Sequence, residues 1–394
     1  LATYLQSQHP KRQILCATQL GWCGDSFVLP DTVIGDGANE TIFQSGERSH
    51  EEYTTAGTLQ GWQEGIAARA VGNQLLMLAL SAAFAGALLT PTYSEGGGIH
   101  FVGDSSTGKS TLIEAAASVW GGAGFKRSWR STANGMEGAA SMFNDGLLAL
   151  DEISECDPKD VGAIIYALGN GVGKQRASKS GAARGLTRWK CFIVSSGEKT
   201  IETAMLEGGK AIKAGQGVRL LDIPTAQTYG AWDALHREYN PAAFSDAIKR
   251  SAKEHHGHAG RAFLERLTRD KQDFCARLEA LKSSSDFHFT DVELDGQEKR
   301  AAGRFALLAL AGELATEYGI TGWIKGEALE AAHEAFKLWL HGRSGKGNSE
   351  QHQIIQQVTA FIDRHGDGRF SNAKETITPN VQNRAGWWND GDAG

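Results

Sequence analysis

The chain has 394 residues, 41% of them hydrophobic, and a formal net charge of −6 at pH 7. This length allows one large domain or two to three smaller ones around a substantial core. The negative charge excludes a uniformly basic nucleic-acid coat, while a local basic path stays compatible with it. Five scattered cysteines form no Cys-x-x-Cys pair and support neither a zinc knuckle nor a disulfide framework. Free thiols predict a reducing, cytoplasmic compartment.

The first ninety residues are predicted to combine a small β-rich part with a helix. The chain begins at Leu1 without a signal peptide, and the missing Met indicates a piece of a longer protein. Residues 1–57 contain short apolar runs between turn residues, which predict strands. A helical pattern then runs from Thr58 to Leu89, with a break at Gly72. Its apolar part is shorter than the ~20 residues of a membrane span, so we predict a buried helix and no membrane association.

The central motif is the stretch from Gly98 to Thr111, where a strand pattern leads through a glycine-bounded loop into a helix start. It matches Gly-x-x-x-x-Gly-Lys-Ser, the pattern of a phosphate-binding loop, in the strand–loop–helix context that this loop requires. Glycines let backbone N–H groups converge on phosphate oxygens, and the helix N-terminus favours negative charge. A chance turn before a helix is the alternative, but it does not explain the pattern and the context together.

The side chains of this loop have separate expected roles. Lys109 can reach the β- and γ-phosphates of a nucleoside triphosphate, and Ser110 can ligate Mg²⁺. The predicted nucleotide-binding residues are Gly103, Asp104, Ser105, Ser106, Thr107, Gly108, Lys109, Ser110 and Thr111.

A second apolar strand pattern, residues 147–150, ends in the paired carboxylates Asp151 and Glu152. Downstream of a phosphate-binding loop, the first carboxylate is expected to hold Mg²⁺, directly or through water. The adjacent Glu152 is placed to polarise the attacking water as a general base. Capping of the following helix is the alternative, and the loop upstream favours the nucleotide site.

Residues 161–197 contain six Lys and Arg residues and no Asp or Glu. Within them, residues 171–188 are rich in Gly, Ser and Ala and are predicted to form a hairpin or a loop. A basic loop of this kind suits contacts with a phosphate backbone, which are electrostatic and need no base reading. Lys174, Arg176 and Lys179 are the predicted nucleic-acid contacts, and a solvated basic loop is the alternative.

Polar residues flank two later strand patterns. Either Ser195 or Ser196, at the end of one strand, could sense the γ-phosphate or orient water, and a strand-end serine in a turn is the alternative. Arg219, at the start of the next strand, could act as an arginine finger on the nucleotide of a neighbouring subunit. A structural salt bridge to Asp222 is the alternative for this arginine.

The remaining chain is predicted to be largely helical. Amphipathic stripes predict helices over residues 298–318 and 326–340, and their apolar positions are expected to form core. The predicted parts are a β-rich N-terminal subdomain (1–57), a P-loop ATPase core (58–228), a helical region (229–345) and a C-terminal winged-helix-like remnant (346–394).

Several motifs in order resemble the domain-of-unknown-function family 927. They are Ser128-Trp-Arg-Ser-Thr-Ala-Asn-Gly-Met-Glu-Gly-Ala-Ala, Asn144-Asp-Gly-Leu-Leu-Ala-Leu-Asp-Glu-Ile, Gly169-Asn-Gly-Val-Gly-Lys-Gln-Arg-Ala and Gly217-Val-Arg-Leu-Leu-Asp-Ile-Pro. The likeness covers most of the chain and is specific, because separate motifs occur in the expected order. Proteins of this family are ATPase modules of phages, plasmids and integrated elements, often described as helicases or as inactivated derivatives, and often found next to primase-like domains.

The resemblance implies an α/β fold of the P-loop NTPase type, similar to AAA+ proteins and superfamily III helicases. A parallel sheet with flanking helices, a small β-rich N-terminal part and a helical C-terminal region are then expected. The implied function is that of a mobile-element replicative helicase, which hydrolyses Mg-ATP at the subunit interfaces of a hexameric ring and moves along single-stranded DNA. A primase-like domain in the full-length protein is a further expected partner.

The resemblance also assigns roles to individual residues. The first nucleotide motif is matched by Gly103, Gly108, Lys109 and Ser110, and the second by Asp151 and Glu152. Ser196 falls where related helicases carry a sensor Asn, which leaves its role open, and Arg219 falls where a trans-acting arginine is expected. Every residue expected to contact the nucleotide is present, which favours an active ATPase over an inactivated derivative.

Two other functions share part of this pattern. An ATP-driven DNA-binding loader, initiator or remodeller without unwinding activity would carry every nucleotide motif found here. A GTPase-type switch would need an Asn-Lys-x-Asp motif, which the sequence lacks.

Overall fold

The computed structural model divides the chain into two compact units, Leu1–Gly342 and Arg343–Gly394. The structure describes residues 2–7, 13–44, 52–173, 186–209, 217–287, 294–342, 361–362, 365–366, 368–372 and 383–388. The finer division into four parts, with boundaries after residues 57, 228 and 345, stays a prediction.

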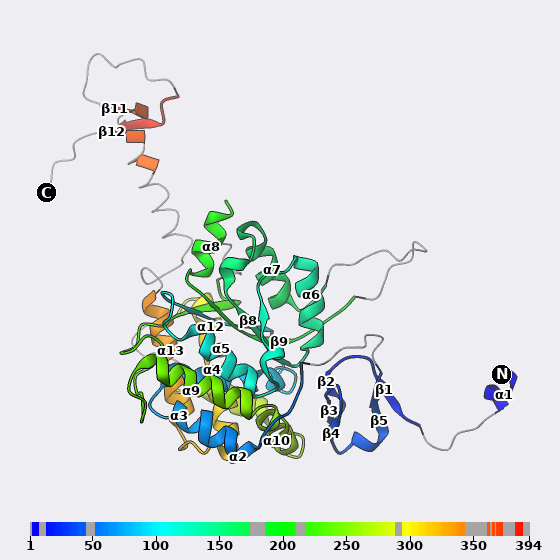
Figure 1. Cartoon of the computed structure of the whole chain (residues 1–394). Coiled ribbons are helices and arrows are strands. Elements are labelled where there is room, and N and C mark those ends of the chain that lie inside the picture. Colours follow the sequence, from blue (N-terminus) through cyan, green and yellow to red (C-terminus); the bar gives the residue numbers. More distant parts are fainter. Residues whose placement is uncertain are drawn as a thin grey trace. The chain divides into compact units, whose positions relative to one another are not determined.

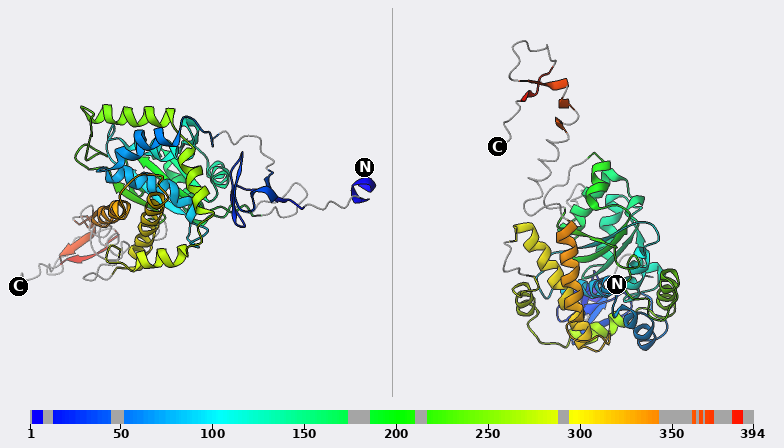
Figure 2. Two further views of the ribbon diagram at one scale, coloured as in Figure 1. Left: turned by 90° about the horizontal axis from the view of Figure 1, so that it is seen from below. Right: turned by 90° about the vertical axis from the view of Figure 1, so that its left-hand side faces the viewer.

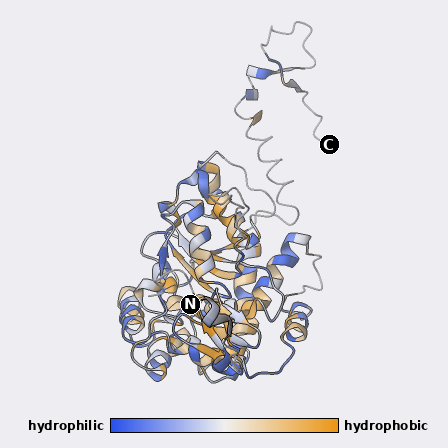
Figure 3. Cartoon of the chain, turned by 90° about the vertical axis from the view of Figure 1, so that its right-hand side faces the viewer, coloured by the Kyte–Doolittle hydropathy of each residue, from blue (hydrophilic) through white to orange (hydrophobic). Residues whose placement is uncertain are grey.

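A five-stranded parallel sheet lies at the centre of the first unit (Figure 1). In spatial order its strands are β10 (Leu220–Pro224), β6 (Gly97–Val102), β9 (Cys191–Gly197), β8 (Gly146–Asp151) and β7 (Arg127–Ser128). The long strands are apolar runs, because both faces of a parallel sheet are covered by helices. Figure 3 shows the central strands in orange, the colour of hydrophobic residues.

The register of the sheet aligns the strand ends at two common edges. Val102, the last residue of β6, pairs with Gly197 of β9 and Pro224 of β10. Near the other end of β6, Gly98 pairs with Leu220. The turns after β6, β8 and β9 therefore lie at the carboxyl edge, where open parallel sheets bind their ligands. The segments that precede β9 and β10 lie at the amino edge.

Helices cover both faces of this sheet (Figure 1). The first face carries α4 (Gln74–Ala85) and α5 (Lys109–Ser118), both packed against β8 and β9. The second face carries α6 (Ala133–Met142), α7 (Pro158–Asn170) and α8 (Ile201–Glu207). The predicted α/β fold with flanking helices is confirmed.

Two long C-terminal helices of the first unit pack on the outer side of α4. They are α12 (Gly296–Glu317) and α13 (Glu327–Gly342), which lie side by side (Figure 2). Because α4 lies between these helices and the sheet, it is buried along almost its whole length, and this accounts for its apolar sequence. None of the helices that the structure describes is long and apolar enough to span a membrane.

Shorter helices complete the first unit. They are α1 (Ala2–Ser7), α2 (Leu59–Trp62), the π-helical turn η2 (Gln63–Ala67), α3 (Ala68–Ala70), α9 (Pro241–Glu254), α10 (His258–Leu267) and α11 (Phe274–Lys282). Single 3-10 turns are η1 (Ala38–Glu40), η3 (Gly86–Leu88), η4 (Ala123–Phe125) and η5 (Ile153–Glu155). The helical C-terminal region is thus confirmed.

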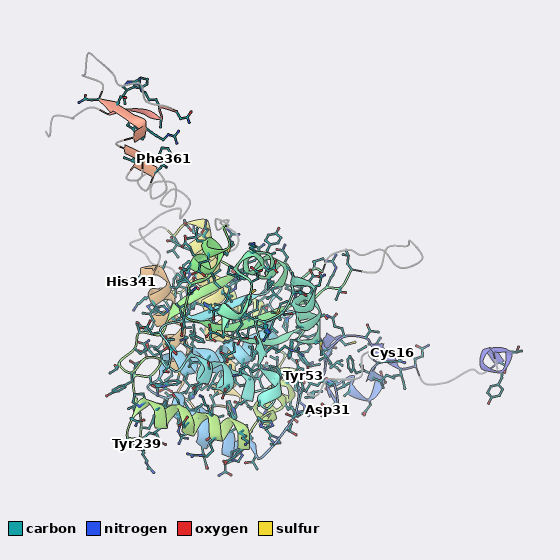
Figure 4. All side chains as sticks on the ribbon, turned by 45° about the horizontal axis from the view of Figure 1, so that its top comes forward. Cys16, Asp31, Tyr53, Tyr239, His341 and Phe361 are labelled. Carbon is teal, nitrogen blue, oxygen red and sulfur yellow. The ribbon has the colours of Figure 1, made fainter. Side chains whose placement is uncertain are left out.

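The N-terminal part contains short strands, as predicted. An antiparallel sheet is formed by β2 (Gly21–Cys23), β3 (Ser26–Val28) and β4 (Val33–Gly35), and a parallel pair by β1 (Leu15–Ala17) and β5 (Thr41–Phe43). The indole N–H of Trp22 donates to the carbonyl of Ala87 at 2.8 Å. Asp31, labelled in Figure 4, pairs with Arg261 of α10 at 3.0 Å. These contacts attach the small sheet to the core.

The described part of the second unit contains one parallel strand pair, β11 (Phe370–Asn372) and β12 (Gly386–Trp388). Phe361, labelled in Figure 4, lies under the guanidinium of Arg369, 5.2 Å from the ring centroid. The winged-helix-like character of this terminal piece stays a prediction.

Candidate nucleotide-binding site

The phosphate-binding loop follows β6 and leads directly into α5 at the carboxyl edge. Gly108, its last residue, has a φ of +98°, a left-handed conformation that glycine adopts without strain. A Cβ atom there would also lie 2.8 Å from the ring of Trp232, so glycine is required for two reasons. Lys109 is only 6% exposed, and its Nζ donates to the carbonyl of Asp104 at 2.5 Å. The loop therefore folds around its own lysine.

The segment after β10 supports this loop from the side. The hydroxyl of Thr225 donates to the carbonyl of Val102 at 3.0 Å and lies 3.1 Å from the hydroxyl of Thr107. The N–H of Ala231 donates to the carbonyl of Thr107 at 2.7 Å. These contacts fix the position of Thr107 in the loop, and no local sequence motif marks them.

The carboxylate of Asp151, at the end of β8, contacts three side chains. Its Oδ1 accepts hydrogen bonds from the hydroxyls of Ser196 at 2.6 Å and Ser110 at 3.1 Å. Its Oδ2 accepts a hydrogen bond from Nζ of Lys126 at 2.8 Å. Burial by itself raises the pKa of Asp151, but the hydrogen bonds from Lys126 and Ser196 outweigh it and hold the pKa below its usual value. Asp151 is therefore ionised at neutral pH.

The oxygen atoms around Asp151 fit a magnesium ion. Mg²⁺ prefers hard oxygen ligands and usually keeps several waters and phosphate oxygens in its shell. The hydroxyl of Ser110 and Oδ1 of Asp151 are such ligands, and they come from different elements to within 3.1 Å of each other. Residues that the sequence predicts for the metal therefore lie together at the carboxyl edge, next to Lys109.

Glu152 follows Asp151 in an unusual backbone conformation. Its φ of +58° is in the left-handed region, which costs a non-glycine residue energy and is often found at functional sites. The carboxylate accepts hydrogen bonds from the N–H of Ser154 at 3.3 Å and from its hydroxyl at 2.7 Å. The N–H of Glu152 donates to the hydroxyl of Ser196 at 3.2 Å. Ser196 thus contacts both acidic residues.

The two serines at the end of β9 point to different sides of the strand. While Ser196 contacts Asp151, the buried hydroxyl of Ser195 lies 2.8 Å from Nδ1 of His100 and accepts from the indole N–H of Trp129 at 2.8 Å. Burial lowers the pKa of His100 to about 4, so this imidazole is neutral at physiological pH. Of the two candidates, Ser196 is therefore the one that lies in the site.

A half-buried carboxyl group, that of Asp222 of β10, lies beside His100 in the register of the sheet. Its Oδ1 accepts a hydrogen bond from the N–H of Ile201 at 3.1 Å, which holds the start of α8. Burial raises the pKa of Asp222 from 3.8 to about 7. Between these two values the folded chain binds more protons than the unfolded chain, so stability falls as the pH rises through this window.

Asp222→Asn is expected to remove this pH dependence, because the amide keeps an acceptor for Ile201 but carries no charge. The free energy of unfolding of the variant should exceed that of the wild type by about 4 kcal/mol at pH 8 and differ little at pH 4. Urea denaturation at the two pH values measures the difference. Asp246→Asn, an exposed change on α9, should have little effect at either pH. Parallel stability profiles for Asp222→Asn and the wild type would contradict the prediction.

Arg219 lies at the amino edge, one residue before β10 and away from the phosphate-binding loop at the other edge. Its Nη2 donates to Oδ1 of Asn170 at 2.6 Å, and its guanidinium lies 4.7 Å from the centroid of the Tyr166 ring. Both partners belong to the last part of α7. The structure thus does not bring Arg219 to the site formed by Lys109 and Asp151 of the same chain.

A cavity of about 450 Å³ opens at the same edge, and Arg219 is one of its lining residues. Arg188 and Lys190 also line it, beside the buried ring of Trp189. The backbone pairing of Val172 with Arg188 marks where the basic segment, residues 171–188, leaves and rejoins this edge. Its three predicted nucleic-acid contacts, Lys174, Arg176 and Lys179, lie outside the described residues.

The family model named Domain of unknown function (DUF927) matches residues 1–188. These residues form a DUF927 domain. The resemblance predicted from the motifs is thereby confirmed over this part of the chain. Among curated proteins, none matches the chain.

The likeness to a solved helicase structure extends beyond the DUF927 domain to most of the chain. A chain described as SCCmec type IV Cch, active helicase, matches with a TM-score of 0.70 and 20% sequence identity. The match covers 95% of this chain and 69% of that chain. This likeness shows a helicase-like α/β fold.

The DUF927 domain contains the phosphate-binding loop and the Asp151–Glu152 pair, whereas Ser196 and Arg219 lie beyond residue 188. The candidate nucleotide site therefore combines residues of the DUF927 domain with Ser196 of the following segment. Lys126, inside the domain, is a contact of Asp151 that sequence reasoning missed. It is a single lysine in a short connection, and no spacing or motif marks it.

Proposed function

We propose that the chain is an Mg-ATP-hydrolysing motor module of a mobile genetic element, which moves along single-stranded DNA and unwinds duplex DNA as a homo-oligomeric, hexameric ring. The observation that carries the proposal is the convergence of Ser110, Asp151 and Ser196 beside the phosphate-binding loop. The helicase-like fold supports the same reading.

In this proposal the loop binds the triphosphate of ATP. Lys109 exchanges its contact with the carbonyl of Asp104 for phosphate oxygens, and backbone N–H groups of the loop donate to the same oxygens. Ser110 and Asp151 would hold Mg²⁺, which would supply positive charge to stabilise the charge on the transferred phosphoryl group. Glu152 accepts the proton of the attacking water. Ser196, bonded to both Asp151 and the N–H of Glu152, holds their relative position.

Arg219 is proposed to complete the nucleotide site of a neighbouring subunit. It lies at the amino edge, about 17 Å from the carboxyl edge for a strand of five residues at ~3.3 Å each. That separation prevents contact with a phosphate bound in its own chain. Asn170 and Tyr166 hold the guanidinium in place, which reduces the entropy lost when it contacts a phosphate. A ring places such an arginine opposite the site of the next subunit.

The proposed DNA contacts are Lys174, Arg176 and Lys179 in the basic segment between α7 and β9. Two observations at the ends of this segment support the assignment. Arg188 and Lys190 add positive charge at the point where the segment returns to the sheet, and both line the cavity at the amino edge. Phosphate-backbone binding needs such clustered positive charge and no base reading.

Replacement of Lys174, Arg176 and Lys179 by Ala tests this function. Wild-type ATPase activity is expected to rise at least about tenfold with single-stranded DNA, and the variant should lose this stimulation while keeping its basal rate. A triple Ala variant of three exposed cations elsewhere in the chain, Lys253, Lys271 and Lys325, is the matched control. A coupled ATPase assay at several salt concentrations measures both rates.

The outcomes separate the alternatives. If the variant of Lys174, Arg176 and Lys179 keeps the stimulation by single-stranded DNA, the DNA contact lies elsewhere in the chain. Wild-type ATPase activity without strand displacement on forked DNA would favour a loader or remodeller over a helicase. Lys109 lies in the phosphate-binding loop. Both the helicase and the loader or remodeller therefore require that its replacement abolishes ATPase activity.

A further inference from the structure

The ammonium group of Lys126 lies between two carboxylates at the edge of the nucleotide site. Its Nζ donates to Oδ2 of Asp151 at 2.8 Å and to Oε1 of Glu114 at 3.0 Å. The three side chains are 25%, 18% and 30% exposed, so none of them is fully solvated. Lys126 follows η4 and precedes β7, in the connection that leaves the end of α5.

The position of Glu114 places this ion pair next to the predicted metal ligands. Ser110 and Glu114 are four residues apart on α5 and therefore lie on the same side of the helix, one turn apart. Asp151 uses Oδ1 for hydroxyl groups and Oδ2 for the ammonium, so both of its oxygens already have a partner. A cation is thus present beside the oxygens that would bind a metal, and it belongs to the chain itself.

We propose that Lys126 is a resident cation that prevents Asp151 and Glu114 from binding a free divalent metal ion, and that it leaves Asp151 when the metal arrives with the nucleotide. The inference rests on the proposed role of Ser110 and Asp151 as metal ligands. It assigns to Lys126 a positioning role that the phosphate-binding motif does not contain.

The physical reason is repulsion between like charges. A divalent ion on Asp151 would lie within a few ångströms of the ammonium, where two charges interact strongly in a partly desolvated site. Without nucleotide, binding of the ion would also have to break two hydrogen bonds of Lys126. A bound triphosphate adds several negative charges next to the site, and the flexible four-carbon stem of lysine lets the ammonium move toward them. Metal binding then depends on prior or simultaneous nucleotide binding.

Titration of Mn²⁺ into the nucleotide-free protein tests the proposal, with the loss of the free-ion signal in electron paramagnetic resonance as readout. Wild type should bind Mn²⁺ weakly, and Lys126→Met should bind it at least about tenfold more tightly. The double variant Lys126→Met/Asp151→Asn should lose this gain. Lys282→Met removes an ion-paired lysine on α11 and should behave as wild type. Equal Mn²⁺ affinity of wild type and Lys126→Met would overturn the proposal.

The same titration with ADP present separates this inference from the proposed function. Tight Mn²⁺ binding by wild type only with ADP, together with an unchanged Lys126→Met, would refute the role of Lys126 and leave the metal site intact. No protein-dependent Mn²⁺ binding with ADP would refute the metal site itself. If Lys126→Met does not fold, Lys126→Gln keeps a hydrogen-bond donor for both carboxylates and should show the same gain. Near-ultraviolet circular dichroism reports whether each variant is folded.

Discussion

Replacing Glu152 by Gln is expected to lower ATP turnover at least about 10²-fold while leaving nucleotide affinity close to that of the wild type. Gln preserves the shape of the side chain and can still accept a hydrogen bond from Ser154, but it cannot take a proton from water. Asp151 keeps its contacts with Ser110 and Ser196, so the proposed metal site stays assembled. Steady-state phosphate release and the binding of a fluorescent ATP analogue measure the two quantities separately.

Glu155→Gln is the matched control for this change. Glu155 belongs to the same turn, is exposed and accepts a hydrogen bond from the hydroxyl of Ser128. Because it lies outside the proposed site, its amide variant should turn over ATP at nearly the wild-type rate. Hydrolysis at a near-normal rate by Glu152→Gln would remove Glu152 as the general base. Equal loss in both variants would point to a change in the turn rather than in catalysis.

Replacing Trp129 by Ala is expected to lower the free energy of unfolding by about 3–5 kcal/mol, the usual cost of removing a large buried aromatic ring. Trp129 is fully buried directly after β7. Its backbone N–H donates to the carbonyl of Asp151 at 3.3 Å, and its indole N–H donates to Ser195. The cavity would therefore open beside two strands that carry the candidate site. Urea denaturation followed by circular dichroism measures the loss.

Trp129→Phe separates packing from hydrogen bonding at this position. Phe keeps most of the buried ring but leaves the hydroxyl of Ser195 without its indole donor, so we expect a loss of about 1–2 kcal/mol. His100 remains as a partner of that hydroxyl and limits the loss. A cost for Trp129→Ala no larger than that for Trp129→Phe would show that the cavity relaxes and that the predicted packing contribution is wrong.

Local patterns predicted the elements of the site because each of them is contiguous in sequence. The strand, loop and helix from Gly98 to Thr111 follow one another along the chain, and the residue types required by the loop identify it. Local patterns predicted the apolar strand before Asp151 and the uncharged helix α4 in the same way. In each case the signal is a run of residues whose burial does not depend on a distant partner.

Contacts between distant segments could not be predicted in this way. Lys126 reaches Asp151 because β7 and β8 are neighbours in the sheet. No local sequence pattern predicts that strand order. The choice between Ser195 and Ser196 depends on which side of β9 faces the site, since successive side chains alternate across a strand. Thr225 reaches the phosphate-binding loop only because β10 lies beside β6. Each of these positions requires the topology of the sheet.

The placement of Arg219 shows that strand direction decides which role a residue can have. Its sequence position indicated an arginine near a strand, and either a salt bridge or a phosphate contact suited that description. Because the strands are parallel, a residue that precedes β10 lies at the edge opposite the phosphate-binding loop. The role proposed for it therefore depends on a second subunit, and it stays a prediction.

Strand β9 starts at the edge where the basic segment returns, and its next-to-last residue, Ser196, lies against Asp151 at the other edge. The six steps between its seven residues span about 20 Å at ~3.3 Å per step, and strands on both sides hold it in place. A hydrogen-bonded strand inside a close-packed sheet is stiff along its length, so it behaves as a mechanical rod. A pull on the basic segment would be transmitted to the hydroxyl of Ser196 without passing through any flexible joint among the residues of β9. Under the proposed function, an opposing load on the DNA would then alter the rate of the chemical step itself.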